Sequence, residues 1–214
     1  MKESEDGYKD SPYIVTQAGN FYLDDPKFNL AAMAHSLGQL ARYNGHANIF
    51  YSVAEHSVLV SLLMEELGLG DPLEGLLHDG TEYILSDIPS PFKHLLPDWR
   101  IFESKLDAAM RMQFRLPEIK TAGCKKADWL ALFIEAEQIL PGKGKGFYDP
   151  EGLRNVALGL RHKHGWMVRG LEWKHAGAIF LARYEQLKRG SNRHATGQVF
   201  DQSASDTVAS HETV

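Results

Sequence analysis

The sequence lacks several features that mark particular classes of protein. Its 214 residues include a single cysteine, Cys124, which excludes an intrachain disulfide and a zinc site built from several thiolates. The formal net charge is −5 and the isoelectric point is near 6.0, which argues against a broad nucleic-acid-binding surface. No run of about 20 apolar residues is present, so we expect no membrane span. The polar, acidic start MKESEDGYKDSPY is unlike a signal or transit peptide, and we therefore expect a cytoplasmic protein.

Strand signals and internal repeats are also scarce, whereas helical patterns are frequent. Hydrophobic residues make up 43% of the chain, which is enough for a proper core. The sequence therefore predicts an all-α fold with little or no sheet. It also predicts one domain over residues 21–189, between an N-terminal lead-in over 1–20 and a flexible C-terminal tail over 190–214.

Start and stop signals place the helices. Asn29 can cap a first helix, Ser52 and Glu55 form a capping-box pattern before a second, and Asp71-Pro72 begins a third that reaches His78-Asp79. Further helical patterns cover about 98–115, 121–140, 150–162 and 171–189. The glycine-rich PGKGKG stretch lacks the GK[ST] ending of a phosphate-binding loop and is interpreted as a linker. Apolar residues on the last helix favour a homo-oligomer; they are Leu171, Ile179, Phe180 and Leu187.

Two histidines and two aspartates are candidates for a metal site. His56 and His78 lie on consecutive helices with a short connection, and these helices should be antiparallel neighbours. Asp79 follows His78, and Asp128 is a carboxylate in an otherwise apolar helical stretch. A buried carboxylate is costly unless it is paired or bound to a metal, so Asp128 alone fits a paired or capping role about equally well. Together the four side chains suit Zn, Co or Mn, with no thiolate to narrow the choice.

The order of these residues resembles a known superfamily. A histidine, a later His-Asp pair and a distant aspartate are typical of the HD-domain metal-dependent phosphohydrolases. The chain is similar in detail to phage dATP triphosphohydrolases and bacterial 5′-deoxynucleotidases over most of residues 20–140. The matching segments are Arg42-Tyr43, VAEHS around His56, HDGTE from His78, Asp87, PSPFK with Lys93, and KKAD ending at Asp128.

This resemblance implies an HD-domain helical bundle and a role for each matching residue. His56, His78, Asp79 and Asp128 would hold a divalent transition metal. Glu82 would position or protonate at the scissile P–O bond, Arg42 and Lys93 would contact phosphate, Tyr43 would pack near the base or deoxyribose, and Asp87 would line the site. A bound metal lowers the pKa of a coordinated water, which makes a nucleophile available at neutral pH. Each of the last four residues also has a simpler interpretation when it is taken alone. Arg42 could interact with the C-terminus of a helix, and Tyr43 could only pack against its neighbours. Asp87 could be a turn residue, and Lys93 could be a solvated surface lysine.

The expected reaction is hydrolysis of dATP to deoxyadenosine and triphosphate, with a small-molecule deoxynucleotide as the partner. A 5′-deoxynucleotidase that cleaves deoxynucleoside monophosphates is the close alternative. Tyr43 stands where the bacterial nucleotidases have tryptophan, so base and chain-length preference stay open. Alarmone hydrolases carry an acidic residue where this chain has Tyr83, which argues against that activity. A catalytically inert nucleotide-binding module of the same fold is the remaining alternative.

Overall fold

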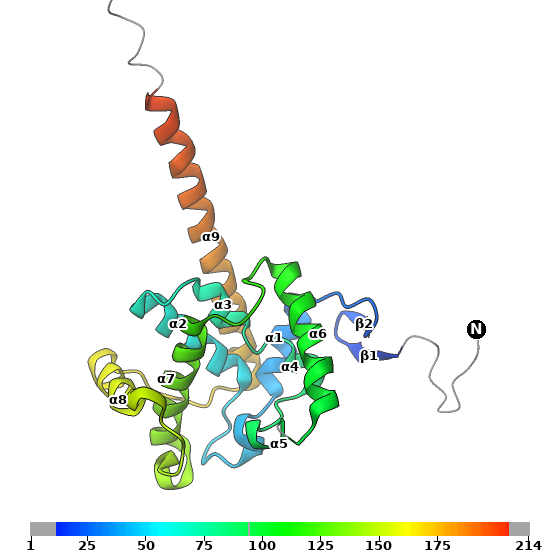
Figure 1. Cartoon of the computed structure of the whole chain (residues 1–214), viewed down its shortest axis with the longest axis vertical. Coiled ribbons are helices and arrows are strands. Elements are labelled where there is room, and N and C mark those ends of the chain that lie inside the picture. The colour runs from blue at the N-terminus through cyan, green and yellow to red at the C-terminus, as the bar shows by residue number, and fades with distance from the viewer. Residues whose placement is uncertain (1–11, 94, 206–214) are drawn as a thin grey trace, which may run out of the picture.

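The computed structural model describes residues 12–93 and 95–205 and is mostly helical (Figure 1). The elements follow in the order β1 (Tyr13–Thr16), β2 (Gly19–Tyr22), α1 (Leu30–Gln39), η1 (Arg42–Gly45), α2 (Val53–Leu67), α3 (Pro72–Leu77), α4 (Glu82–Leu85), α5 (Ser90–Lys93), α6 (Pro97–Phe114), α7 (Ala122–Ile139), η2 (Pro141–Gly144), η3 (Pro150–Gly152), α8 (Leu153–His164) and α9 (Trp173–Ser205). The prediction of a helical fold with little sheet is confirmed at this level. Among the described residues no helix is both long and apolar enough to cross a bilayer.

The predicted helix starts are confirmed by their hydrogen bonds. The Asn29 side chain accepts from the amide of Ala32 at the start of α1. Ser52 and Glu55 form a complete capping box at the start of α2. These contacts satisfy amide groups that a helix leaves without internal partners. They fix where α2 begins, and therefore where His56 lies on it.

Helix α2 lies between two apolar clusters. One cluster joins Ala54 of α2 to α1, α3, α6 and α9, and the other joins Val60 of α2 to α7 and α8. His56 lies between these two positions along α2 and is fully buried. Because both neighbouring clusters consist of buried side chains, the backbone that carries this histidine is held on two sides.

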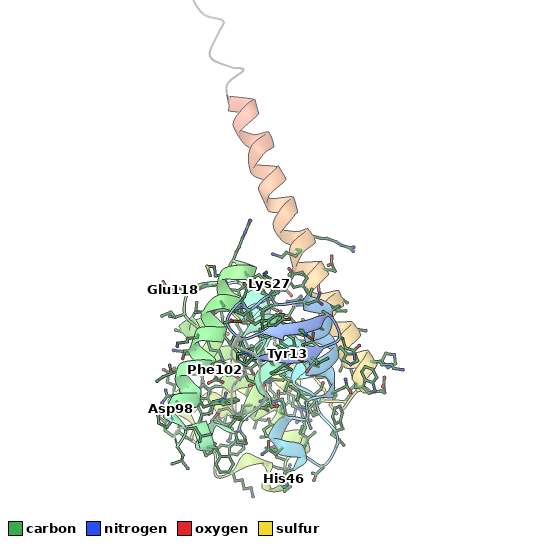
Figure 2. All side chains as sticks on the ribbon, turned by 90° about the vertical axis from the view of Figure 1, so that its right-hand side faces the viewer. Tyr13, Lys27, His46, Asp98, Phe102 and Glu118 are labelled. Atoms are coloured by element: carbon green, nitrogen blue, oxygen red, sulfur yellow. The ribbon has the colours of Figure 1, made fainter. Side chains whose placement is uncertain are left out.

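The N-terminal hairpin was not predicted. β1 and β2 form an antiparallel pair across the end of the expected lead-in at residue 20, with Tyr13 opposite Tyr22. Phe21 is its buried side chain and packs edge-on against Phe28 and Tyr83. Figure 2 shows the hairpin with Tyr13 in front of the body. The hairpin is short and mostly exposed, so its sequence has little of the alternation that identifies a half-buried strand.

Two helices end in places that differ from the prediction. α3 ends at Leu77, so the helix that was expected to reach His78-Asp79 stops just before them, and both residues lie in a turn before α4. α9 continues to Ser205 and projects beyond the body (Figure 1), so residues 190–205 of the expected flexible tail are helical. No proline interrupts residues 190–205, which lets the helix continue. Residues 1–11 of the expected lead-in and 206–214 of the expected tail lie outside the described residues.

The apolar face of α9 packs within the chain. Phe180 is fully buried in the first core cluster, and Leu171 and Leu187 pack against that cluster. Ile179 remains 36% exposed. This face is therefore largely used internally and gives little support for an oligomer, which stays a prediction.

Candidate metal centre

Three of the four predicted metal ligands form a compact group. His56 on α2, His78 at the end of α3 and Asp128 on α7 offer ligand atoms that all lie within 4.8 Å of one another. Both histidines are buried, and the Asp128 side chain is 34% exposed. Asp79 Oδ2 is 2.9 Å from Nε2 of His78 and 3.6 Å from Nε2 of His56. The structure therefore brings side chains of α2 and of the turn after α3 together with a side chain of α7, which is distant from them in the sequence.

The spacing of these atoms fits a single ion. The two Nε2 atoms of His56 and His78 are 3.3 Å apart, and His56 Nε2 is 3.2 Å from Asp128 Oδ1. Metal–ligand bonds of about 2.0–2.2 Å place neighbouring ligands roughly 2.9–3.5 Å apart. The group could therefore hold a divalent metal ion with only small side-chain movements.

The hydrogen bonds behind the imidazoles define which nitrogen faces the centre. His78 Nδ1 lies 2.8 Å from the carbonyl oxygen of Gly75, and His56 Nδ1 lies 2.6 Å from Oε1 of Glu135. Both partners accept hydrogen bonds, so Nδ1 carries the proton and Nε2 of each neutral ring presents a lone pair. These positions suit a cation, which is either a metal ion held by both Nε2 atoms or a proton on His56 Nε2 that Asp128 Oδ1 accepts at 3.2 Å. Burial and Arg42 lower the pKa of His56, but Glu135 and Asp128 outweigh them and raise this pKa to about 9.

Glu135 is a site residue that the sequence reasoning missed. It lies on α7 with no exposed surface and accepts hydrogen bonds from His56, Arg42, Tyr43 and Tyr51. Burial raises the pKa of Glu135, but Arg42 and His56 outweigh burial and hold it below its ordinary value. Glu135 follows Asp128 by seven residues, which is two helical turns and nearly the same helix face. A second carboxylate at this spacing in an apolar helix was the sequence signal that could have identified Glu135 as a site residue.

Lys120 is a second residue that was not predicted. Its Nζ lies 3.6 Å from Asp79 Oδ1 and 3.5 Å from Asp128 Oδ2, the oxygens other than those that face the histidines. Burial raises the pKa of Asp79, but His78 and Lys120 outweigh it and hold the pKa well below its ordinary range. Lys120 is recognisable only after folding, because it lies in a loop with no motif around it.

Glu82 lies near the centre, and its surroundings favour the protonated form of its carboxyl group. Its Oε2 is buried and, among the described residues, has no hydrogen-bond partner. Burial raises the pKa of Glu82 well above its ordinary value, and the charges of Asp79 and Asp87 raise it further. Lys93 Nζ is 4.0 Å from Glu82 Oε1 but only 2.7 Å from Glu103 Oε1. Lys93 is therefore close to Glu82 but engaged mainly with another carboxylate.

Asp87 is half-buried and belongs to the same electrostatic group. Burial raises its pKa, and the charge of Arg42 lowers it. The negative charge of Asp87 in turn raises the pKa values of Arg42 and Glu82. The structure thus places it near the other predicted residues, as a charge rather than through a direct contact with them.

Arg42 and Tyr43 begin the turn η1. Arg42 donates from Nε to Glu135 Oε2 at 3.2 Å and has Nη1 3.9 Å from Asp79 Oδ2. A cavity of about 270 Å³ lies beside Arg42, lined by the loop that ends at Tyr51. Tyr43 has a left-handed backbone with φ of 57°, and its hydroxyl donates to Glu135 Oε2 at 2.5 Å. The hydroxyl of Tyr43 is therefore engaged by Glu135, and packing of Tyr43 near the base or deoxyribose stays a prediction.

Comparison with known proteins gives relatives whose names state no activity. No family model matches the chain. The uncharacterized protein YfdR of Escherichia coli (strain K12) is 35% identical over 181 residues, which cover 82% of this chain and 95% of YfdR. The uncharacterized protein RCAP_rcc00048 of Rhodobacter capsulatus is 36% identical over 146 residues, which cover 60% of this chain and 74% of that protein.

Proposed function

The chain belongs to the same protein family as YfdR, and we propose that it is a metal-dependent phosphohydrolase of the HD-domain type that hydrolyses deoxynucleotides. Among these substrates we propose dATP, converted with water to deoxyadenosine and triphosphate. The chemistry of the side chains around His56 supports the proposal, together with the motifs that resemble this superfamily. The relatives' names contribute nothing to it.

Four side chains would hold the metal: His56, His78, Asp79 and Asp128. Two neutral imidazole nitrogens and two carboxylate oxygens suit Zn, Co or Mn. When bound, such an ion supplies a water with a lowered pKa and neutralises charge that develops on the phosphoryl oxygens. Asp128 is partly exposed, so water and substrate could reach the ion from its side of the centre.

Glu82 is the proposed proton donor. Cleavage of the bond between the α-phosphorus and O5′ leaves negative charge on O5′, which needs a proton. Burial raises the pKa of the Glu82 carboxyl well above its ordinary value, which favours the protonated form that a general acid needs. The oxygen of water then stays on the triphosphate, and the proton of Glu82 passes to O5′.

Positive charge near the centre would bind the phosphates. Arg42 borders the cavity beside the site, and its guanidinium reaches toward Asp79. Guanidinium and ammonium groups make charge-assisted hydrogen bonds to phosphoryl oxygens. Lys93 would join Arg42 after turning from Glu103 toward the substrate.

One observation carries the proposal: two imidazole Nε2 lone pairs lie 3.3 Å apart beside two carboxylates, next to a buried carboxyl that favours its proton. Without a metal, the raised pKa of His56 favours a proton at this position, and a bound metal ion would replace that proton. A hydrolytic metal site with an acid donor accounts for both features.

Product analysis tests the proposal. The protein loaded with Co, Mn or Zn is incubated separately with the four dNTPs, the four dNMPs and ATP, and nucleoside, phosphate and triphosphate are resolved. Formation of deoxyadenosine and intact triphosphate from dATP is the expected result. Asp79→Ala should abolish turnover, whereas Asp98→Ala, at an exposed aspartate on α6, should not.

Other product patterns would replace the proposal. Cleavage of several dNMPs without cleavage of dNTPs would make the protein a 5′-deoxynucleotidase that uses the same residues. Tight nucleotide binding without turnover for any of the three metals would make it an inert binding module. Equal turnover by wild type and Asp79→Ala would attribute the activity to a contaminant.

A further inference from the structure

The Glu135 carboxylate accepts hydrogen bonds from four donors, two at each of its oxygens. Oε1 accepts from His56 Nδ1 at 2.6 Å and from the Tyr51 hydroxyl at 3.1 Å. Oε2 accepts from Arg42 Nε at 3.2 Å and from the Tyr43 hydroxyl at 2.5 Å. These donors come from η1, from the residue before the α2 cap, and from α2 itself. The carboxylate therefore has every lone-pair direction occupied and little freedom to rotate.

Packing alone does not account for a charged group at this position. The neighbouring residues of α7, Ile134 and Ala136, have no exposed surface, and neither does Glu135. Burying a carboxylate in such surroundings carries a desolvation penalty, and well-packed apolar residues of similar volume are often at least as stable as a buried ion pair. The carboxylate is thus a costly choice for a purely structural role.

Its contact with His56 has a direct chemical effect. A carboxylate that accepts from Nδ1 fixes the imidazole in the tautomer that presents Nε2 to the metal, and it increases the basicity of Nε2. The three remaining donors hold the carboxylate in the orientation that this contact requires. His78 has only a neutral backbone carbonyl, that of Gly75, behind its Nδ1. The two histidine ligands therefore differ, and His56 would be the stronger one.

We propose that Glu135 is a positioning residue that acts through His56 to set the affinity of the metal centre. The inference rests on the metal site in the proposed function but requires no particular substrate. Arg42, Tyr43 and Tyr51 contribute indirectly because they orient Glu135. Loss of a single tyrosine hydroxyl should therefore weaken metal binding less than loss of the carboxylate.

Co²⁺ titration tests this proposal without any substrate. The full chain is stripped of metal and titrated with Co²⁺, and binding is followed by the visible absorption of the bound ion. Glu135→Gln keeps the size of the side chain and removes its charge, so we expect Co²⁺ affinity to fall about 10- to 100-fold, as is usual for groups behind metal ligands. The absorption spectrum should also change, because the field of the His56 ligand changes.

The matched control lies two residues further along the same helix. Glu137 has a side chain 23% exposed and pairs with Lys143 at the surface. Glu137→Gln should leave Co²⁺ affinity and spectrum as in wild type. Glu135→Asp retains the charge at a shorter reach and should restore part of the affinity, which a role in filling space would not produce.

Several outcomes would overturn the inference. It fails if Glu135→Gln binds Co²⁺ as tightly as wild type, or if Glu137→Gln weakens binding equally. It also fails if wild type binds no Co²⁺. Should Glu135→Gln not fold, Tyr51→Phe provides the test, because it removes only one donor to Oε1, and an unchanged Co²⁺ affinity in that variant would count against the proposal. If Co²⁺ binding depends on Glu135 while no nucleotide is hydrolysed, the inference stands and the proposed function fails.

Discussion

The buried contact between Glu74 and Arg111 offers a quantitative test of how the site is held. Glu74 Oε1 accepts from Arg111 Nη1 at 3.2 Å and from the Thr121 amide at 2.9 Å, and its Oε2 accepts from Thr121 Oγ1 at 2.6 Å. Glu74 and Arg111 are each 1% exposed. Thr121 caps α7 and follows Lys120, so this network joins α3 and α6 to the start of the helix that carries Asp128.

The magnitude follows from what a substitution would leave behind. Glu74→Gln preserves volume and removes one of the two carboxylates that compensate Arg111. Arg111 keeps two partners, Asp107 at 2.8 Å and the carbonyl of Pro117 at 3.1 Å. Removing one partner of a buried ion pair costs about 3–5 kcal/mol, and we expect the lower end of this range because Asp107 remains. For a chain of this length, a loss of about 3 kcal/mol lowers Tm by roughly 6–12 °C.

Urea unfolding followed by circular dichroism measures this effect. Glu118→Gln, at an exposed position on the same loop as Lys120, is the matched control and should change the free energy of unfolding by less than about 0.5 kcal/mol. Adding Arg111→Met to Glu74→Gln should recover much of the loss, because the uncompensated charge is then gone. A loss below about 1 kcal/mol in Glu74→Gln would refute the reasoning, as would a double variant less stable than the single one.

Three further predictions address catalysis, pH and packing. Glu82→Gln should lower turnover of the best deoxynucleotide substrate by roughly 10²- to 10⁴-fold while Co²⁺ affinity is retained; unchanged turnover would remove Glu82 as proton donor. Burial raises the pKa of Cys124 to about 12, above its value near 8.5 in an unfolded chain, so its contribution to stability is complete below about pH 8.5 and is lost as pH rises toward 12. Unfolding measured from pH 8 to 10.5 should therefore show a steeper decline in wild type than in Cys124→Ala, and parallel declines would contradict the assignment. Gly123→Ala would place a Cβ 1.9 Å from the Leu69 carbonyl oxygen and should destabilise strongly, whereas Gly146→Ala has open space and should not; equal melting temperatures would show that the backbone relaxes freely.

Features that depend on nearby residues could be predicted from the sequence. The cap at Asn29 and the capping box at Ser52 were correct because each involves residues three apart, whose contacts arise within one turn. His56 and His78 were placed together because consecutive helices pack side by side, and Asp128 was added by side-chain chemistry and by the resemblance to the HD-domain superfamily. The structure groups all three.

Features that depend on long-range contacts could not be predicted. Glu135 receives hydrogen bonds from Arg42 and Tyr43, which are more than 90 residues away, so no local pattern marks it. Lys120 gains its role only because its loop passes beside Asp79 and Asp128. The hydrogen bond from Tyr43 to Glu135 was missed for the same reason, since its partner lies on a distant helix. Propensity and spacing do not report which polar groups a fold brings into contact.

The Glu55 carboxylate, besides closing the α2 cap, accepts a hydrogen bond at Oε1 from the Leu171 amide, at 3.1 Å. This hydrogen bond connects the chain segment before α9 to the first turn of α2, at the residue that precedes His56. Helix ends ordinarily fray, and their amides exchange hydrogen with solvent much faster than those of the core. Here the first turn of α2 can open only if the start of α9 also detaches. Its amides should therefore exchange at rates close to those of the core, and His56 should keep its position during local fluctuations that loosen the exposed loops.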